Sequence, residues 1–225
     1  MSDIVAIEAG GTKFVLAWGS GPDDLHDRVE IATESPDETM PKVIDFIQQT
    51  QKKTSIAAIG AAVFGPLELN RQAPNYGSIT TTTKLEWRNF DFVGCLQQAC
   101  DLPVGFDTDV NGAAMGEWRW GAAQGLTDFL YLTVGTGIGG GGMSGGKLLH
   151  GAMHPEMGHI LIPQDLKRDS FAGICHYHQN CLEGLASGPA IKERWHVGSA
   201  LDLPPGHEAW ELEASYLSAA LMNYT

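Results

Sequence analysis

Two glycine-rich turns of the same design lie far apart in this chain. The first spans residues 8–13 (EAGGTK) and the second spans residues 133–139 (TVGTGIG), and each follows a short apolar segment that is typical of a β-strand. Glycines at a hairpin tip let backbone N–H groups converge on an anion because no Cβ stands in the way, and Thr12 and Thr136 add hydroxyl donors. The pair therefore predicts two phosphate-binding turns.

The pattern around each turn predicts an α/β fold. After the first turn we expect a return strand at 14–17, and after the second a return strand at 147–149. The remaining pattern predicts a strand at 28–32, a helix from Pro36, a strand at 55–64, a helix at 89–100, a strand at 103–106, a helix capped by Asn111, and a C-terminal helix at 211–224. The similarity of the two halves indicates duplicated βββαβαβα domains with a cleft between them.

Composition excludes several classes of protein. The 225 residues are 43% apolar and 18% charged, which is ordinary for a globular protein and excludes disordered and collagen-like chains. The formal net charge of −13 argues against binding to nucleic acid or to an anionic membrane surface. Without a long apolar run or a secretory signal pattern, the expected location is cytoplasmic, where four cysteines are better explained as thiols or metal ligands than as disulfides.

Two other nucleotide-binding motifs are weighed against the second turn. Gly135, Gly137 and Gly140 satisfy the spacing of a dinucleotide-binding loop, but the residues that follow are glycines and a poor helix start, whereas that loop must open a helix. A Walker loop also fails, because Leu148 stands where a Ser or Thr would bind magnesium.

Asp109 is the candidate catalytic residue. It stands where a strand ends and a helix begins, which is where reactive side chains of α/β proteins meet a crevice. A carboxylate there is suited to accept a proton from an alcohol. The alternative is that Asp107 or Asp109 only caps the helix N-terminus.

A second cluster of residues has the composition of a zinc site. Cys175, His178 and Cys181 follow one another at steps of three, and His159 can supply a fourth ligand from a separate loop. His176 is a rival ligand, and two buried free thiols are the alternative. A closed four-ligand site has no position for an activated water, so we expect a structural zinc.

Two acidic residues flank this cluster in the sequence. Glu156 and Glu183 are suited to accept hydrogen bonds from sugar hydroxyls beside a rigid metal loop, and the alternative is that either is only a surface charge. Cys95 and Cys100 are expected in the core of the preceding helix.

Taken together, these segments resemble the ROK family of sugar kinases over nearly all of the chain. The matching segments are 8–13, 107–114, 135–139, 156–159 and 175–181. Within the family the chain is similar to the bacterial fructokinase group, because 76–80 (YGSIT), Trp87, Arg88 and 175–178 (CHYH) resemble that group more than the C-x-C-G-x-x-G-C pattern of the glucokinases.

The resemblance implies the actin-like ATPase, or ribonuclease H-like, fold. The expected domains are 1–118, which holds the first turn and Asp109, and 119–225, which holds the second turn and the zinc loop. Family members continue into a further glycine-rich segment that packs on adenosine, so the second domain is expected to be truncated.

The resemblance also implies a role for each candidate residue. Asp109 becomes the general base for transfer of the γ-phosphoryl group of ATP to a hexose, with fructose to fructose 6-phosphate favoured and Mg²⁺ on the phosphates. The residues implied to bind the nucleotide are Gly10, Gly11, Thr12, Lys13, Gly135, Thr136, Gly137 and Pro189. Those implied to contact the sugar are Glu156, His159 and Glu183, with His159 doubling as a zinc ligand. The expected partners are ATP and the hexose, and a homodimer is left open.

Two other functions compete with the kinase. A non-catalytic sugar-binding protein of the same family, either a sensor or an inactive truncated relative, would bind sugar without phosphoryl transfer. A nicotinamide-dependent dehydrogenase is supported only by the spacing of the glycines in the second turn, and failure to bind NAD would exclude it.

Overall fold

The computed structural model describes residues 2–151 and 154–225. The chain forms two compact units, of which unit 1 comprises Met1–Phe129 with Gly142–His154, and unit 2 comprises Leu130–Gly141 with Pro155–Thr225. The strands are β1 (Asp3–Ala9), β2 (Lys13–Gly21), β3 (Asp24–Ala32), β4 (Ile56–Val63), β5 (Ser78–Ile79), β6 (Phe90–Asp91), β7 (Val104–Thr108), β8 (Phe129–Val134), β9 (Ile138–Ser144) and β10 (Lys147–Leu148). The helices are α1 (Pro36–Lys53), α2 (Phe92–Cys100), α3 (Asp109–Trp120), α4 (Leu182–Ala186), α5 (Gly188–Trp195) and α6 (Glu208–Tyr224), with three short 3₁₀ turns, η1 (Leu85–Trp87), η2 (Met157–His159) and η3 (Ala200–Asp202).

Unit 1 is built on a five-stranded sheet in the order β3-β2-β1-β4-β7. The first turn joins β1 and β2 as an antiparallel hairpin, and β1, β4 and β7 run parallel. Val5, Ile7 and Ala9 of β1 are buried while the residues between them are exposed, which is the two-residue period of a strand with one covered face. Because β4 and β7 run parallel, their carboxyl ends lie at the same edge of the sheet.

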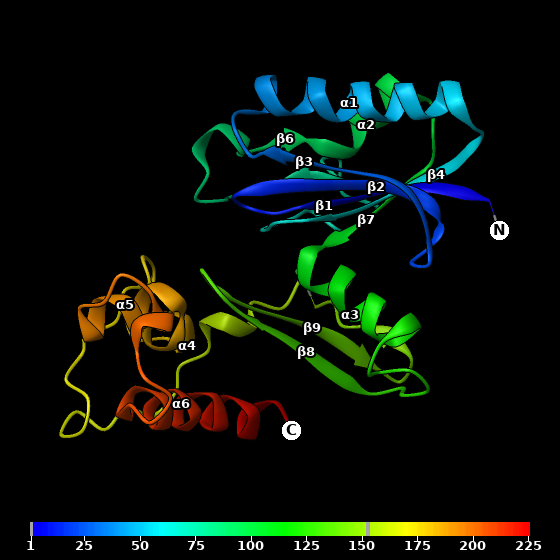
Figure 1. Cartoon of the computed structure of the whole chain (residues 1–225). Coiled ribbons are helices and arrows are strands. Elements are labelled where there is room, and N and C mark those ends of the chain that lie inside the picture. The colour runs from blue at the N-terminus through cyan, green and yellow to red at the C-terminus, as the bar shows by residue number, and fades with distance from the viewer. Residues whose placement is uncertain (1, 152–153) are drawn as a thin grey trace. The chain divides into compact units, whose positions relative to one another are not determined.

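Helices cover both faces of this sheet. Figure 1 shows α1 and α2 on one face and α3 on the other. The core of unit 1 lies mainly under α1 and α2, where the ring of Phe14 stands 5.5 Å from that of Trp87 and 6.3 Å from that of Phe92. Helix α1 begins with a capping box between Ser35 and Glu38.

Two local expectations from the sequence are wrong. Helix α3 is capped by Thr108, whose Oγ1 accepts a hydrogen bond from the Asn111 N–H at 3.2 Å, so Asn111 lies inside the helix rather than at its cap. The strand that follows the second turn is β9, which begins directly at Ile138, and the expected strand at 147–149 is the short β10. Residues 139–142 are all glycine and still form part of β9, because a strand is paired through backbone N–H and carbonyl groups that glycine also has.

Unit 2 contains β8, the start of β9 and the helices α4, α5 and α6. Its main core gathers Leu182 and Leu185 of α4 with Leu212 and Tyr216 of α6, all buried. Helix α6 starts earlier than expected, at Glu208, because the His207 ring accepts a hydrogen bond from the Ala209 N–H at 3.1 Å. In the part of the chain that the structure describes, no helix is long and apolar enough to cross a bilayer.

Candidate functional site: two glycine turns, a carboxylate and a Cys/His cluster

The first glycine turn is held by hydrogen bonds that leave its tip exposed. The Gly10 N–H donates to the Lys13 carbonyl at 3.0 Å, and Thr33 Oγ1 donates to the Gly10 carbonyl at 2.8 Å. A Cβ on Gly10 would stand 3.0 Å from the Lys13 carbonyl oxygen, so a side chain there would crowd the turn. Gly11 and Thr12 are exposed at the tip, where they can meet an anion.

Two lysines lie beside this turn. The Lys13 ammonium, expected to bind phosphate, forms an exposed ion pair with Glu30 at 2.8 Å. Hydrogen bonds from Lys13 and then Arg28 hold the pKa of Glu30 below its usual value. The side chain of Lys84 also reaches the turn, with its Cε 3.5 Å from the position that a Cβ on Gly11 would take. Sequence reasoning missed Lys84, because nothing local links residue 84 to residue 11.

Asp109 is the first residue of α3, directly after β7. Its Oδ1 accepts a hydrogen bond from the Val110 N–H at 2.9 Å. The helix approaches β4 closely at Gly112, where a Cβ would stand 2.4 Å from the Ala62 Cβ. Because Thr108 caps the helix, the carboxylate of Asp109 is not needed for that role.

The amide of Asn111, two residues further along α3, is fully buried and has four neighbouring polar groups. Its Nδ2 donates to Asp107 Oδ1 at 3.0 Å and to the Leu149 carbonyl at 3.3 Å, and it lies 3.3 Å from the His150 ring. Its Oδ1 accepts a hydrogen bond from the Gly142 N–H at 3.3 Å. The other oxygen of Asp107 lies 2.8 Å from His150 Nε2. This network fixes the end of β7 beside Asp109.

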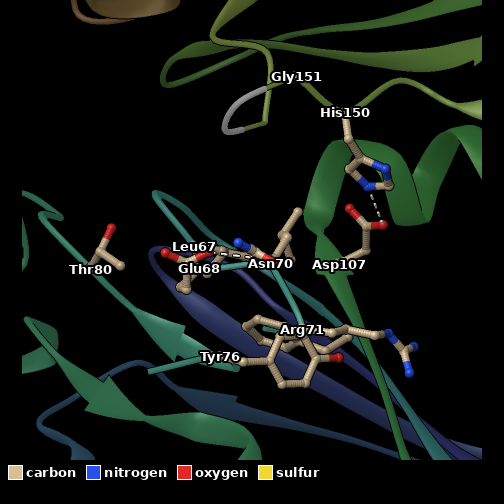
Figure 2. A pocket seen from close by; sticks show the side chains of 11 residues that line it. Leu67, Glu68, Asn70, Arg71, Tyr76, Thr80, Asp107, His150 and Gly151 are labelled. Carbon is tan, nitrogen blue, oxygen red and sulfur yellow. Dashed lines mark hydrogen bonds and ion pairs between the residues drawn. The ribbon is translucent and has the colours of Figure 1, made fainter. Parts of the chain in front are cut away.

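A cavity of about 610 Å³ opens at the ends of β4 and β7, within unit 1. Figure 2 shows Asp107 and His150 pointing toward one another at one end of the view and Thr80 at the other, with Glu68 and Asn70 between them. The residues that line the cavity are Leu67, Glu68, Leu69, Asn70, Arg71, Tyr76, Thr80, Phe106, Asp107, His150 and Gly151. The rings of Tyr76 and Phe106 meet edge to face at 6.5 Å. Two carboxylates, one guanidinium and two aromatic rings suit a neutral ligand with many hydroxyl groups.

The second glycine turn lies in unit 2 against the N-terminus of α5. The Gly188 N–H donates to the Gly135 carbonyl at 2.8 Å, and Gly135 N–H donates to the Gly137 carbonyl at 2.9 Å. Pro189 stands in the first turn of α5 after the Ser187 cap. The turn therefore lies beside a helix N-terminus, an arrangement that favours phosphate. It opens a strand rather than a helix, so the dinucleotide-binding motif is not met.

The four expected metal ligands lie together in unit 2. Their ligand atoms, from His159, Cys175, His178 and Cys181, are all within 4.8 Å of one another. The Sγ to Nδ1 distances are 3.7 Å and 3.8 Å from Cys175 to His159 and His178, and 3.5 Å from Cys181 to His159. A tetrahedral zinc with ordinary bond lengths separates a sulfur and a nitrogen ligand by about 3.6 Å, so the four residues fit this metal. Burial raises the pKa of the Cys181 thiol to about 11.

Backbone geometry holds this cluster together. Cys175 and Gln179 exchange backbone hydrogen bonds of 3.1 Å and 2.9 Å, which closes a tight loop around His178. A Cβ on Gly184 would stand 1.7 Å from the Gln179 carbonyl oxygen, so only glycine lets α4 pack this closely. All four ligands come from unit 2.

Both expected sugar-contacting glutamates lie beside His159. Glu183 Oε1 is 4.0 Å from His159 Nδ1, and Glu183 Oε2 accepts a hydrogen bond from the Ile138 N–H at 2.9 Å. Glu156 Oε2 is 4.0 Å from His159 Nε2 and its side chain is half exposed. Unit 2 therefore brings together the second turn, Pro189, the metal ligands and both glutamates, while unit 1 holds the first turn, Asp109 and the cavity.

Comparison with solved structures defines the class of fold. A ROK hexokinase from Thermus thermophilus superposes with a TM-score of 0.76 at 28% identity, covering 99% of this chain and 77% of that one. A ROK family glucokinase from Streptomyces griseus, solved with glucose and AMPPNP, superposes with a TM-score of 0.70 at 26% identity, covering 85% of this chain and 59% of that one. The chain has the actin-like ATPase fold of these sugar kinases.

Sequence comparison then gives the family. The ROK family matches residues 4–217. A putative fructokinase of Bacillus subtilis is 48% identical over 97% of this chain and 71% of its own length, and a fructokinase of Zymomonas mobilis is 46% identical over 94% of this chain and 71% of its own length. The chain belongs to the ROK family, as the motifs predict, and spans about seven tenths of these two relatives.

Proposed function

We propose that this chain is an ATP-dependent sugar kinase whose acceptor is D-fructose and whose product is fructose 6-phosphate. The observation that carries the proposal is the position of the Asp109 carboxylate, directly after the carboxyl end of a parallel strand in the unit that also holds an exposed glycine turn. The names of the fructokinase relatives support fructose as the acceptor.

Each residue has a defined task in this reaction. Asp109 accepts the proton of the attacking hydroxyl as its oxygen bonds to the γ-phosphorus, and the bond from phosphorus to the β–γ bridging oxygen breaks, leaving ADP with that electron pair. The amides of the two turns hold the phosphates, and Gly10, Gly11, Thr12, Lys13, Gly135, Thr136, Gly137 and Pro189 are proposed to contribute. A Mg²⁺ ion bound with the nucleotide would supply charge neutralisation at the phosphates.

Two groups of residues are proposed to contact the acceptor. Glu156, His159 and Glu183 would accept or donate hydrogen bonds to its hydroxyl groups, as the family resemblance implies. In unit 1 we assign the cavity beside Asp107 to hydroxyls of the same sugar, because its aromatic and charged lining suits a neutral polyol and it lies two residues from Asp109 in the chain. Arg71 and Tyr76 would then determine acceptor affinity.

The Cys/His cluster is proposed to hold a structural zinc ion. His159, Cys175, His178 and Cys181 provide a complete tetrahedral set, so the metal would fix the position of His159 rather than activate water. Glu156 lies beside the other ring nitrogen of His159, Nε2, where it can orient the ring, and Glu183 lies beside Nδ1. A cytoplasmic location and a homodimer belong to the same proposal.

The experiment is ADP release from ATP and Mg²⁺ with fructose, mannose, glucose or N-acetylmannosamine. We expect the highest kcat/KM with fructose, and Asp109→Asn should lower kcat by about 10³-fold because the general base is lost. Asp45→Asn, an exposed aspartate on α1, is the matched control and should retain full activity. Sugar binding without turnover for any of the four sugars would favour the non-catalytic alternative.

A further inference from the structure

Lys84 lies beside the first glycine turn, although the two are far apart in the sequence. It lies between residues 80–83 (TTTT) and η1, and its Cε is 3.5 Å from where a Cβ on Gly11 would be. Gly11 is at the exposed tip of the first glycine turn. The end of the Lys84 side chain therefore lies beside the exposed tip of this turn, and its ammonium is one bond further on.

The segment that carries Lys84 is fixed from both sides. The Lys84 N–H donates to Thr82 Oγ1 at 3.3 Å, and Arg88 Nε donates to the Thr82 carbonyl at 2.7 Å. The Trp87 ring is buried, and its Nε1 donates to the Glu34 carbonyl at 2.7 Å. The backbone that carries Lys84 is therefore held in place, and this limits the region that its ammonium can reach.

The charge of Lys84 is not neutralised by the protein. Within residues 2–151 and 154–225, no hydrogen bond or ion pair joins its ammonium to an acidic group, although the chain has 27 acidic residues and only 14 Lys and Arg. Lys13, the lysine of the turn itself, is paired with Glu30. The ammonium of Lys84 is therefore available to pair with an anionic ligand.

We propose that Lys84 is a catalytic residue whose ammonium binds the terminal phosphate of ATP and stabilises the charge that develops during transfer. The inference rests on the proposed kinase function and adds a residue to it. As the acceptor oxygen bonds to phosphorus and the bridging oxygen leaves with its electron pair, Asp109 holds the released proton and Lys84 offsets charge on the equatorial oxygens. Lys84 keeps its own proton throughout.

The test compares Lys84→Met, Lys84→Arg and Lys42→Met. Methionine keeps the length and apolar stem of lysine without its charge, so the fold should be retained, which thermal unfolding checks. Lys42 is an exposed lysine of α1 in the same unit, paired with Glu34 at 2.6 Å, and serves as the matched control. We expect Lys84→Met to lower kcat about 100-fold with the KM for fructose within about threefold. Lys84→Arg should recover most of kcat, and Lys42→Met should be unchanged.

A binding measurement separates this proposal from the proposed function. By calorimetry, the wild type should bind ATP more tightly than ADP, and Lys84→Met alone should lose that preference. If the wild type phosphorylates no hexose but this result holds, the role of Lys84 as a phosphate ligand stands and the kinase function fails. If Lys84→Met keeps both kcat and the preference for ATP, or raises the KM for fructose instead, the proposal is overturned.

Discussion

Glu183 and His159 approach one another to 4.0 Å, between Oε1 and Nδ1, while the second oxygen of Glu183 holds the amide of Ile138 at 2.9 Å. One carboxylate thus joins the Cys/His cluster to the residue at which the second glycine turn ends. The space for it depends on glycine, because a Cβ on Gly137 would stand 2.6 Å from Glu183 Oε2. The metal loop and the phosphate turn of unit 2 are therefore one connected arrangement.

Replacing Glu183 by Gln tests this connection. Glutamine keeps the shape but replaces a charged acceptor by a neutral one, which weakens the hydrogen bond from Ile138 by about 1 kcal/mol. We expect kcat/KM for fructose to fall about fivefold or more, with bound zinc unchanged. Glu193→Gln, an exposed glutamate on α5, should have no effect. If Glu183→Gln and Glu193→Gln have the same kcat/KM, the contact of Glu183 with Ile138 and His159 makes no contribution to catalysis.

Removal of the metal is expected to destabilise unit 2. Elemental analysis of the purified protein should find one zinc per chain, and Cys181→Ser or a strong chelator should remove it and lower Tm, because binding energy at a structural site contributes to folding. Cys95→Ser, which changes a thiol of α2 in unit 1, should keep the zinc. A protein that is purified without zinc and gains no stability from added zinc would contradict the assignment.

The cavity of unit 1 makes a prediction about acceptor affinity. The Arg71 guanidinium carbon lies 5.7 Å from the centre of the Tyr76 ring, and both side chains line the cavity. Arg71→Ala should raise the KM for fructose about tenfold, the effect of one lost hydrogen bond from a charged donor, and leave the KM for ATP unchanged. Arg119→Ala, an exposed arginine on α3, is the control. A change in the KM for ATP alone would place the cavity outside the acceptor site.

Glu213 on α6 makes the stability of the protein depend on pH. Burial raises its pKa to about 7, against the opposing effect of the Arg194 cation, and in the described part of the chain its Oε1 is buried without a hydrogen-bond partner. The folded state therefore binds this proton more strongly than the unfolded state. The stabilisation is full below about pH 4.5 and is lost as the pH rises through about 7.

The measurement is urea unfolding of wild type and Glu213→Gln across that range. Because glutamine cannot ionise, the variant should gain stability relative to the wild type as the pH is raised from 4 to about 8. Glu211→Gln, an exposed neighbour whose side chain is 84% exposed, should show no such trend. A constant difference between wild type and Glu213→Gln at all pH values would contradict the raised pKa.

Local patterns were sufficient to predict most of unit 1. The apolar strand before the first turn, the helix from Pro36 and the strand that precedes Asp109 all follow from properties of neighbouring residues, so they can be predicted from the sequence. The Cys/His spacing likewise predicts a cluster that the structure brings together. The cap of α3 was misjudged because Thr108, Asp109 and Asn111 are all good capping residues, and the choice depends on where β7 releases the chain.

Features that depend on distant residues could not be predicted. Lys84 lies beside Gly11, and His150 beside Asp107, only because the sheet and its loops place them there. The boundary between the two units also depends on distant residues. Leu130–Gly141 belong to unit 2, and the chain then returns to unit 1 at Gly142. No local sequence pattern indicates that the chain returns to unit 1 at this point.

The four partners of Asn111 have a practical consequence for anyone who wishes to study unit 1 as a separate polypeptide. A fragment that stops at Phe129 would retain Asp107 but lose Gly142, Leu149 and His150. The buried carboxamide would then face groups that can no longer satisfy it, at a cost of about 1–3 kcal/mol for each unpaired atom. Such a fragment should fold poorly, whereas one that joins residue 129 to residue 142 through a short flexible linker should restore the amide's partners and hold the helix of Asp109 in place.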